Sequence, residues 1–403
     1  MKTMDLRPPF QGLQGLDPSN AFKTIKTPAY VIDESMLEHN GRILQSVMAK
    51  SNANILLAQK AFSNYDFYPL LATYLAGSEA SGLYEARLGK EMMPEKEVHV
   101  FCGAYRDDEI DEVLQYADHI VFNSIHQLKK FGLKAKQQHK SVGLRINPQC
   151  STQEGHAIYD PCAIGSRLGV TLDVWQQEMD DETLALLDGL HFHTLCEQNA
   201  DALKTTLAAV EKQFDFVLKK MKWLNMGGGH HITRVDYDLP TLLECIAYAQ
   251  SKWHLDVYLE PGEAVALNAG YLITRVLDIV DNNGMKIAIL DASAACHMPD
   301  VIEMPYTPMI YQADTTKSDE KPHFYRLGGP TCLSGDVIGD YYFEDELKAD
   351  DMLILGDMAI YTTCKNNTFN GMPLPSIYRW NKEHQLQLLK SFGYDDFKNR
   401  LGR

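Results

Sequence analysis

Lys60 is the residue whose setting most directly suggests chemistry. It ends the segment 54–60 (NILLAQK), a short apolar run that stops abruptly at an amine. An Ile- and Leu-rich run of this length is typical of a strand buried on both faces. An amine at the rim of a core is partly desolvated, which favours its neutral, nucleophilic form and suits it to a Schiff base. The alternative is a lysine that simply extends from a strand end into water.

Polar residues or glycines also stand at the ends of other apolar runs: Glu79, Arg145, His191, His193, Gly227, Gly228, Gly229 and Glu260. Charged residues are rare in buried strands. Their recurrence at matching ends of several runs therefore indicates one shared site.

Each of these residue types has a chemical use. A glycine turn exposes backbone N–H groups that can hold a phosphate, and Glu260, fixed by Pro261, can keep a pyridine nitrogen protonated. His193 and His191 face one side of a strand, and an imidazole there can stack on an aromatic ring. The ordinary alternatives are a flexible turn and a structural ion pair. The HxH spacing also suits a metal, but no third ligand follows, so no metal is expected.

Glu79 and Arg145 can position Lys60 and adjust its charge, or they can form a salt bridge inside a barrel. The pair His230 and His231 is interpreted as loop polarity and not as a metal site. A Schiff-base lysine, phosphate glycines, a pyridinium carboxylate and a stacking histidine together describe a pocket for pyridoxal 5'-phosphate.

Short apolar runs alternate with amphipathic stretches such as 34–49, 107–116 and 201–218. The eight runs are 55–60, 77–82, 98–104, 119–123, 142–147, 190–194, 223–229 and 257–262. Alternation of this kind predicts parallel strands with crossover helices. Eight units favour a closed (β/α)8 barrel over residues 36–267, with catalytic groups at the C-terminal ends of its strands. A doubly wound open sheet is the alternative, although no GxGxxG motif follows the first run.

After residue 268 the pattern changes to strands, which are predicted at 271–280, 286–291, 324–327 and 352–355 with a turn at 282–284 (NNG). We expect a second, mostly antiparallel β domain made of 268–403 together with 1–35, because 29–33 (AYVID) predicts one more strand. Residues 1–22 are polar and proline-containing, and we expect them to form an extended or poorly ordered lead-in.

The composition limits the class of protein. The 403 residues carry a formal net charge of −16, which disfavours nucleic acid and anionic membranes as partners and weakly favours cationic small molecules. No apolar stretch reaches the roughly 18 residues of a membrane span. Eight cysteines without a CxxC pair or a close cluster predict a reducing, cytoplasmic location.

The order and spacing of several motifs resemble those of the fold-type III pyridoxal phosphate-dependent decarboxylases, the group of alanine racemase, ornithine decarboxylase and diaminopimelate decarboxylase. The resemblance runs from about residue 27 to 380 and rests on 58–61 (AQKA), 79–81 (EAS), 144–147 (LRIN), 191–193 (HFH), 226–229 (MGGG), 260–262 (EPG), 329–332 (GPTC) and 359–362 (AIYT). A closer resemblance, to the carboxynorspermidine and carboxyspermidine decarboxylases, rests on 193–198 (HTLCEQ), 296–300 (CHMPD) and 332–336 (CLSGD).

The resemblance implies a role for each matching residue. Lys60 carries the cofactor as a Schiff base, Glu260 binds the pyridinium nitrogen, and His193 stacks on the ring. The phosphate is held by Gly228, Gly229 and Tyr361. Cys332 comes from the β domain of a neighbouring subunit and returns a proton to the substrate carbon after carbon dioxide leaves. The expected assembly is therefore a homodimer with two shared active sites.

Two positions depart from the family pattern. Ornithine decarboxylase has an arginine that grips the phosphate where this chain has Glu263, and a carboxylate there repels an anion. It also has an acid directly after its cysteine, where this chain has Leu333 and the nearest carboxylate is Asp336. We therefore expect Glu263, Asp300 and Asp336 to pair with the ammonium groups of a cationic amino-acid substrate.

The expected reaction is decarboxylation of carboxynorspermidine to norspermidine, of carboxyspermidine to spermidine, or of both. The one-methylene difference between these substrates is worth only about 1–3 kcal/mol. Decarboxylation of diaminopimelate, ornithine or arginine is the alternative. A catalytically silent, cofactor-binding regulator is the non-enzyme alternative, but we would expect it to have lost Lys60 or Cys332. A racemase is disfavoured because racemases lack the motif around Cys332.

Overall fold

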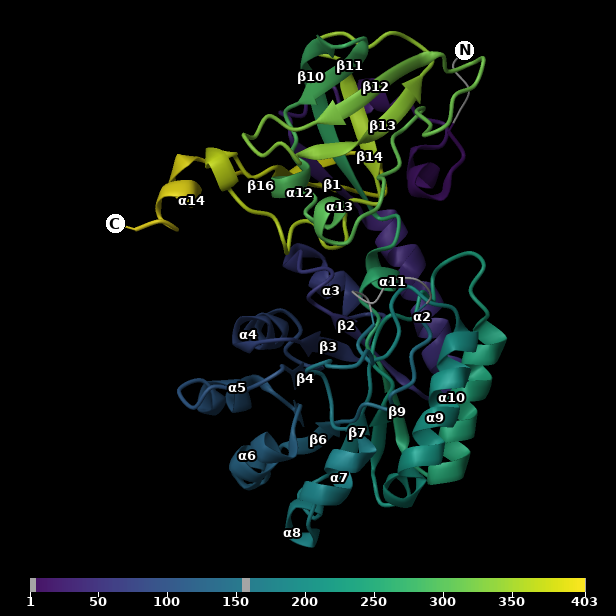
Figure 1. The fold of residues 1–403 in the computed structure, drawn as a ribbon, viewed down its shortest axis with the longest axis vertical. Helices are drawn as coiled ribbons and strands as arrows, with labels where there is room; N and C mark the ends of the chain where they lie inside the picture. Colours follow the sequence, from purple (N-terminus) through teal and green to yellow (C-terminus); the bar gives the residue numbers. More distant parts are fainter. Residues whose placement is uncertain (1–4, 154–159, 403) are drawn as a thin grey trace. The chain divides into compact units, whose positions relative to one another are not determined.

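A computed structural model of the chain, shown in Figure 1, describes residues 5–153 and 160–402. The chain divides into two compact units, one made of His39–Val265 and the other of Met1–Glu38 with Ala266–Arg403. In the described part of the chain, no helix combines the length and the apolar character needed to cross a membrane.

The unit 39–265 is a closed barrel of eight parallel strands. Each strand pairs with the next along the chain, and the last pairs with the first. The strands are β2 (Asn54–Ala58), β3 (Gly77–Ala80), β4 (Glu97–Phe101), β5 (His119–Phe122), β6 (Ser141–Arg145), β7 (Gly189–His191), β8 (Trp223–Asn225) and β9 (Asp256–Leu259). Most of their residues are buried, because helices cover the outside and side chains fill the inside. The predicted (β/α)8 barrel is confirmed.

Helices follow the strands and lie around the barrel (Figure 1). They are α2 (Glu34–Ser51), α3 (Tyr68–Leu71), α4 (Leu83–Met92), α5 (Ile110–Tyr116), α6 (Ile125–Gln137), α7 (Leu172–Glu178), α8 (Asp181–Leu184), α9 (Ala200–Leu218), α10 (Leu239–Trp253) and α11 (Glu263–Ala266). Helical spacing of apolar residues forms their inner faces; in α9, for example, Leu203, Val210 and Phe214 are buried. Local signals set the helix starts, as where the Ser124 side chain accepts the Gln127 N–H before α6.

Every barrel strand ends before the apolar run that predicted it. Strand β7, for example, ends at His191 and not at residue 194. The chain beyond the strands stays buried, since Phe192 and Met226 are fully buried and Leu195 is nearly so. A hydrophobic pattern therefore cannot separate strand from buried loop, and these loops carry most of the candidate site.

The second unit is built on a sheet in the order β13-β12-β11-β10-β1-β15-β16, with β14 paired to β10. Its strands are β1 (Ala29–Asp33), β10 (Gly270–Asn282), β11 (Met285–Leu290), β12 (His323–Gly328), β13 (Val337–Phe343), β14 (Met352–Gly356), β15 (Ser376–Trp380) and β16 (Leu386–Lys390). All pairings are antiparallel except β1 with β15 and β11 with β12. The mostly antiparallel β domain is confirmed, and the segment 29–33 joins it.

The turn between β10 and β11 has the geometry that its sequence predicts. Asn283 and Gly284 both have positive φ, 54° and 82°, as a tight turn between antiparallel strands requires. Three short helices also belong to this unit: α12 (Ala294–His297), α13 (Asp300–Glu303) and α14 (Tyr394–Lys398).

The prediction of an extended or poorly ordered lead-in is wrong for residues 5–22; residues 1–4 lie outside the described range. The segment forms a 3-10 helix (Pro8–Leu13) and α1 (Pro18–Ala21). Phe10 and Phe22 are fully buried, and the Phe22 ring packs edge-on against Trp380 at 5.1 Å. The prolines occupy first-turn positions of these helices, where no N–H donor is needed. They therefore start structure here instead of breaking it.

Candidate active site

The predicted site residues of the barrel meet at the C-terminal ends of its strands. Lys60 follows β2, Glu79 lies in β3, Arg145 ends β6, His193 follows β7 and Glu260 follows β9. The Lys60 charge acts on the pKa values of Glu79, His193 and Glu260, and all three of these side chains are buried or nearly so. The fold thus brings residues that are far apart in the sequence into one site.

Glu260 is held by two side chains inside the barrel. Asn225 Nδ2 donates to Glu260 Oε1 over 2.5 Å, and His191 Nε2 lies 3.1 Å from Glu260 Oε2. Burial on its own would raise the pKa of Glu260, but His191, with smaller contributions from His99 and Lys60, lowers it below the usual range. Glu260 is therefore an ionised carboxylate that can accept one more hydrogen bond.

Asn225 is a site residue that sequence reasoning missed. Its Oδ1 accepts the N–H of Gly227 over 2.9 Å while its Nδ2 donates to Glu260. One side chain therefore ties the glycine turn to the buried carboxylate. The available signal was a polar residue at the end of an apolar run, directly before the MGGG segment.

Glu79 is buried but differs from Glu260 in its partners. Its Oε1 accepts a hydrogen bond from Ser81 Oγ at 3.2 Å, whereas its Oε2 has no hydrogen-bond partner among the described residues. Burial raises the pKa of Glu79, an effect that the Lys60 charge opposes and the Glu260 charge reinforces. Near neutral pH, Glu79 is therefore protonated and Glu260 ionised.

His193 is fixed by two neighbours. The Gly228 N–H donates to His193 Nδ1 at 3.0 Å, and Arg145 Nη2 donates to the His193 carbonyl at 3.0 Å. Burial, with smaller effects of Lys60 and Arg145, holds the pKa of His193 well below its usual range. The imidazole is therefore neutral, with its proton on Nε2.

Arg145 supports the loop that carries His193. Its guanidinium lies 4.7 Å from the centre of the Phe101 ring, and burial lowers the pKa of Arg145 to about 10. It also adds positive charge near Glu260 and Glu79. The predicted contact with Lys60 stays a prediction.

The glycine turn follows β8 and needs its glycines. Gly227 and Gly229 have φ of 69° and 78°, and a Cβ on Gly229 would lie 2.0 Å from the Leu195 carbonyl oxygen. The N–H groups of Gly227 and Gly228 already donate to side chains. Among the hydrogen bonds of the described residues none uses the Gly229 N–H, so this donor remains for a phosphate. The phosphate roles of Gly228 and Gly229 stay predictions.

Lys60 stands in a turn that Gln59 fixes. Gln59 Nε2 donates to the Glu85 carbonyl over 2.9 Å, and its Oε1 accepts from Tyr68 Oη at 3.1 Å. Strand β2 ends before Lys60, which is partly buried beside the Glu79 carboxyl. The turn, and not the strand itself, therefore aims the amine. Gln59 belongs to the AQKA segment, but its role in supporting the Lys60 turn was not predicted.

Four further predicted residues belong to the β unit. Cys332 is exposed on the loop between β12 and β13, and its N–H donates to Asn370 Oδ1 at 2.7 Å. Tyr361 follows β14 with a left-handed backbone, φ 48°. The roles of Cys332 in proton transfer and of Tyr361 at the phosphate stay predictions.

The two acids of this unit that were predicted to bind substrate have partners of their own. Asp336 is 4% exposed and accepts hydrogen bonds from Ser293 Oγ at 2.9 Å and Thr331 Oγ1 at 2.7 Å. Asp300 is ion-paired with Lys365. The substrate roles stay predictions, but the observed contacts give Asp336 another function, the anchoring of the loop that carries Cys332.

Glu263 begins α11 and lies beside His231, with 3.5 Å between Glu263 Oε2 and His231 Nε2. His231 is 7% exposed and His230 is 1% exposed. The interpretation of this pair as loop polarity is therefore wrong: both rings point into the protein. Their burial follows from the adjacent glycine turn, which folds the chain back onto the loop after β7.

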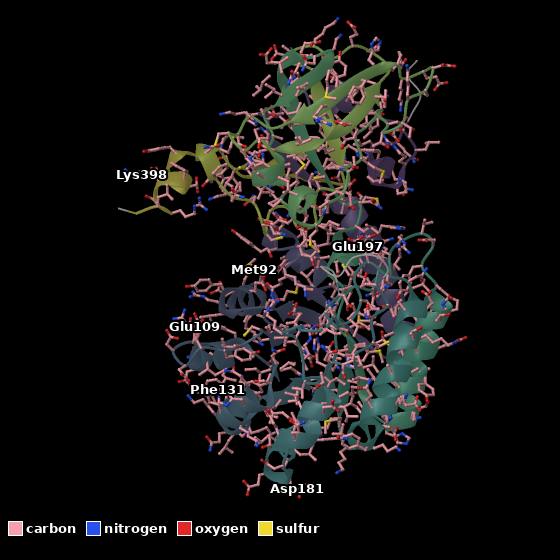
Figure 2. All side chains as sticks on the ribbon, viewed as in Figure 1. Met92, Glu109, Phe131, Asp181, Glu197 and Lys398 are labelled. Carbon is pink, nitrogen blue, oxygen red and sulfur yellow. The ribbon has the colours of Figure 1, made fainter. Side chains whose placement is uncertain are left out.

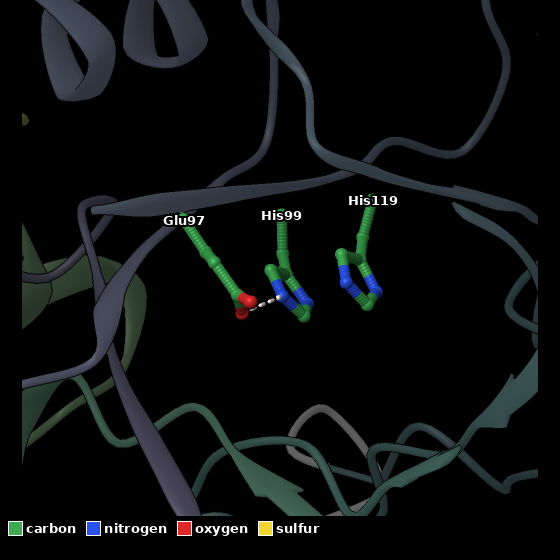
Figure 3. Close-up of side chains that lie close together, drawn as sticks. All are labelled: Glu97, His99 and His119. Atoms are coloured by element: carbon green, nitrogen blue, oxygen red, sulfur yellow. Dashed lines mark hydrogen bonds and ion pairs between the residues drawn. The ribbon is translucent and has the colours of Figure 1, made fainter. Parts of the chain in front are cut away.

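A separate polar cluster lies inside the barrel near the starts of β4 and β5 (Figure 3). Glu97 Oε2 is 3.2 Å from His99 Nε2, and the His99 and His119 rings stack 3.9 Å apart with planes 10° from parallel. Burial lowers the pKa of His119 to about 3, so its ring is neutral. In two stacked rings the nitrogen lone pairs lie in parallel planes, so they do not converge on one ion. Because Trp223 and Tyr258 pack on the pair, we assign the cluster to the packing of the barrel interior.

A phosphorylated pyridine cofactor fits the group at the C-terminal strand ends. Lys60 offers an amine, Glu260 an ionised carboxylate for a ring nitrogen, and Gly229 an available N–H for a phosphate. The unpartnered Oε2 of Glu79 supports the fit, because a buried polar atom without a partner usually marks a site that a ligand or water completes.

Known proteins resemble this chain over nearly its whole length. A family model described as pyridoxal-dependent decarboxylase, C-terminal sheet domain, matches residues 29–359. A carboxynorspermidine/carboxyspermidine decarboxylase from Campylobacter jejuni is 41% identical over 388 residues, which cover 94% of this chain and 99% of that protein. A carboxyaminopropylagmatine decarboxylase from Synechocystis is 37% identical over 380 residues, which cover 94% of this chain and 96% of that protein.

A solved structure extends the similarity to the fold. The crystal structure of carboxynorspermidine decarboxylase from Campylobacter jejuni, complexed with norspermidine, matches with a TM-score of 0.86 and 40% identity. The match covers 93% of this chain and 100% of that one. With a site whose residues fit the same cofactor, the chain belongs to the pyridoxal-dependent decarboxylase family.

Proposed function

We propose that this carboxy-lyase removes carbon dioxide from carboxynorspermidine, carboxyspermidine or both, releasing norspermidine or spermidine. The observation that carries the proposal is the near full-length similarity, at 41% identity, to a relative of that name. Glu263 supports it, because a carboxylate at the end of the barrel favours a cationic substrate tail and disfavours the distal carboxylate of diaminopimelate.

The enzyme uses pyridoxal phosphate, which supplies the electron sink for loss of the substrate carboxylate. Residues of the barrel would bind and orient this cofactor. Lys60 offers the amine that holds the cofactor. Glu260, fixed by Asn225 and His191, would accept the N–H of a pyridinium ring and keep that proton in place. Neutral His193 would offer an uncharged flat face to the ring.

The proton that replaces the lost carboxylate needs a donor, and we assign this step to Cys332. Its thiol is exposed at a loop that Asp336 and Asn370 hold. In this proposal the thiol serves the barrel of a second copy of the chain, so the enzyme works as a homodimer with shared sites. All eight cysteines lie in the described residues and none forms a disulfide bond, which supports a cytoplasmic location.

Carboxyaminopropylagmatine is the second candidate substrate. The relative of that name is 37% identical to this chain, close to the 41% of the first. The two substrate classes differ at the far end of the molecule, which is an ammonium in the carboxylated triamines and a guanidinium in the agmatine derivative. A guanidinium is a planar fork with five donors, whereas an ammonium is a compact charge with three.

The test is turnover by the purified holoenzyme, with carbon dioxide and the amine product both measured. Each assay contains one substrate: carboxynorspermidine, carboxyspermidine, carboxyaminopropylagmatine, diaminopimelate, ornithine or arginine. We expect kcat/KM for the first two to exceed the others by at least about tenfold, and Lys60→Ala to abolish turnover. Preferred turnover of diaminopimelate would contradict the proposal. Preferred turnover of carboxyaminopropylagmatine would transfer it to the second candidate.

A further inference from the structure

Three polar side chains from three different loops meet at the C-terminal end of the barrel. Glu197 follows β7, His231 follows the glycine turn after β8, and Glu263 begins α11 after β9. One carboxylate oxygen of each glutamate and one ring nitrogen of the histidine all lie within 4.8 Å of one another. Glu197 is labelled in Figure 2, at the end of the barrel opposite Asp181. The cluster therefore lies at the same end of the barrel as the site loops.

The central member of this cluster, His231, has a glutamate beside it but makes no side-chain hydrogen bond. His231 is 7% exposed, yet neither of its ring nitrogens makes a hydrogen bond with any described residue. A buried polar group without a partner is unfavourable. The carboxyl groups of Glu197 and Glu263 beside it attract positive charge. Both facts indicate that the cluster is completed by a cationic hydrogen-bond donor.

Backbone contacts fix the three residues relative to one another. The Gln198 N–H donates to the Gly229 carbonyl at 3.0 Å, and the His231 N–H donates to the Gln198 carbonyl at 3.3 Å. On the other side, Thr233 Oγ1 donates to the Ala264 carbonyl at 2.6 Å. Glu197 itself has a left-handed backbone, φ 51°, a conformation that non-glycine residues adopt at a cost and that often marks a functional site. The cluster is thus built by the fold and is not a chance meeting of mobile side chains.

The geometry suits a primary ammonium group. An ammonium has three N–H donors and no acceptor, which matches three acceptors from three loops. The three acceptors lie within 4.8 Å of one another, so a single nitrogen with hydrogen bonds of about 2.9 Å can reach all of them. A guanidinium instead pairs best side-on with a single carboxylate.

We infer that Glu197, His231 and Glu263 bind the terminal ammonium of the polyamine, at the end away from the reacting carbon. This assignment rests on the proposed function and deepens it. It adds Glu197 and His231 to Glu263 as residues that select the substrate. It also distinguishes the ammonium of the carboxylated triamines from the guanidinium of carboxyaminopropylagmatine.

The experiment compares two ligands across matched variants of the holoenzyme. Norspermidine and its mono-N-acetyl derivative are titrated calorimetrically into the wild type, Glu197→Gln, Glu263→Gln and His231→Gln. The acetylated ligand keeps one amine for the reacting end and presents a neutral amide at the other. Glu182→Gln is the control, because Glu182 is an exposed glutamate on α8, outside the cluster.

In the wild type we expect norspermidine to bind at least about tenfold more tightly than the acetylated ligand, because only the former offers the ammonium. Each cluster variant should lose most of that preference by weakening norspermidine binding, while the control keeps it. The wild-type comparison needs no substitution, so it tests the inference even if a variant fails to fold. Cofactor absorbance and unfolding temperature identify such a variant.

Three results would overturn the inference. The first is equal affinity of the wild type for the two ligands. The second is an unchanged preference in Glu197→Gln and Glu263→Gln with the cofactor fully bound. The third is one equivalent of zinc per chain that is lost in Glu263→Gln, which would make the cluster a metal site. If the wild type decarboxylates the carboxylated triamines and any of these results is found, only the ammonium assignment fails; if it decarboxylates diaminopimelate instead, the proposed function fails first.

Discussion

Glu260 and Glu79 lie in the same buried cluster, yet their protonation differs. Asn225 and His191 bind both oxygens of Glu260 and favour its ionised form. Glu79 accepts one hydrogen bond from Ser81, and burial raises its pKa. The distribution of hydrogen-bond partners, and not the residue type, therefore decides which carboxyl carries the charge.

Asn225→Ala tests this at the residue scale. The change removes a donor from Glu260, so the pKa of Glu260 rises toward its usual value and the ionised form is lost at a higher pH than in the wild type. We expect kcat to fall roughly 10- to 100-fold, the value of a hydrogen bond to a charged group, and the acidic limb of the kcat–pH profile to move to higher pH.

Asn123→Ala is the matched control for this prediction. Asn123 is also a buried asparagine at the C-terminal end of a barrel strand, directly after β5. It donates to the Arg167 carbonyl and accepts from the Gly169 N–H, both over 2.8 Å. It touches no carboxylate through these bonds. Its substitution should lower stability and leave the pH profile in place. An unshifted profile in Asn225→Ala would contradict the role given to Glu260.

At the scale of elements, two short segments, the glycine turn and the loop that carries Cys332, position residues of the candidate site. The alternation of apolar runs with amphipathic stretches predicted all eight barrel strands, because a strand buried on both faces is a continuous apolar run in the sequence. It did not predict where the strands end, because the following loops are equally buried. It also missed Asn225 and gave His231 the wrong setting, because their neighbours Glu260 and Glu263 lie in another part of the sequence and are brought near only by the fold.

Gly229→Ala should disturb the turn more than backbone strain alone would. A left-handed alanine costs about 1–2 kcal/mol, and here its Cβ also meets the Leu195 carbonyl at 2.0 Å. Gly284→Ala is the control, since Gly284 has a similar φ of 82° and nothing within 4 Å. We expect the first variant to lose more unfolding free energy than the second and to bind pyridoxal phosphate more weakly. Equal losses with unchanged cofactor affinity would show that the turn does not shape the cofactor site.

Asp336→Asn distinguishes anchoring from substrate binding. As an anchor, Asp336 accepts hydrogen bonds from the hydroxyl groups of Ser293 and Thr331. An asparagine in its place turns an N–H donor toward one of these hydroxyl donors, which costs about 1–3 kcal/mol. We expect lower kcat, lower stability and faster alkylation of Cys332 relative to the exposed Cys364, with little change in KM. Asp340→Asn, which breaks an ion pair with Arg326 in the same unit, is the control. A raised KM with normal stability would instead support direct substrate binding by Asp336.

At the scale of the whole molecule, the chain has two compact units, and the predicted site residues are distributed over both. Lys60 and the residues that fix it lie in the barrel, and Cys332 lies in the β unit. The sequence pattern changes from mixed helix and strand to strands alone after residue 268, close to the boundary between these units at residue 265. The N-terminal helices were not predicted, because their prolines indicate irregular structure. The nearby Phe10 and Phe22, which are buried, were not considered.

Shared sites in a homodimer predict complementation between two inactive variants. Lys60→Ala and Cys332→Ala are each expected to be nearly inactive. If the two residues of one site come from different subunits, mixed dimers contain one intact site, and random reassembly of equal amounts gives about one quarter of wild-type activity. No recovery on mixing, in dimers shown to have exchanged subunits, would place both residues of a site in one chain.

The most direct test of the account is the ratio of kcat/KM for carboxynorspermidine to kcat/KM for diaminopimelate with the wild-type holoenzyme. The two substrates share the reacting amino-acid end and differ in the charge of the far end. A carboxylate at position 263 predicts a ratio well above ten, because a cationic tail is attracted and an anionic one repelled. A ratio near or below one would contradict both the proposed substrate and the role of Glu263.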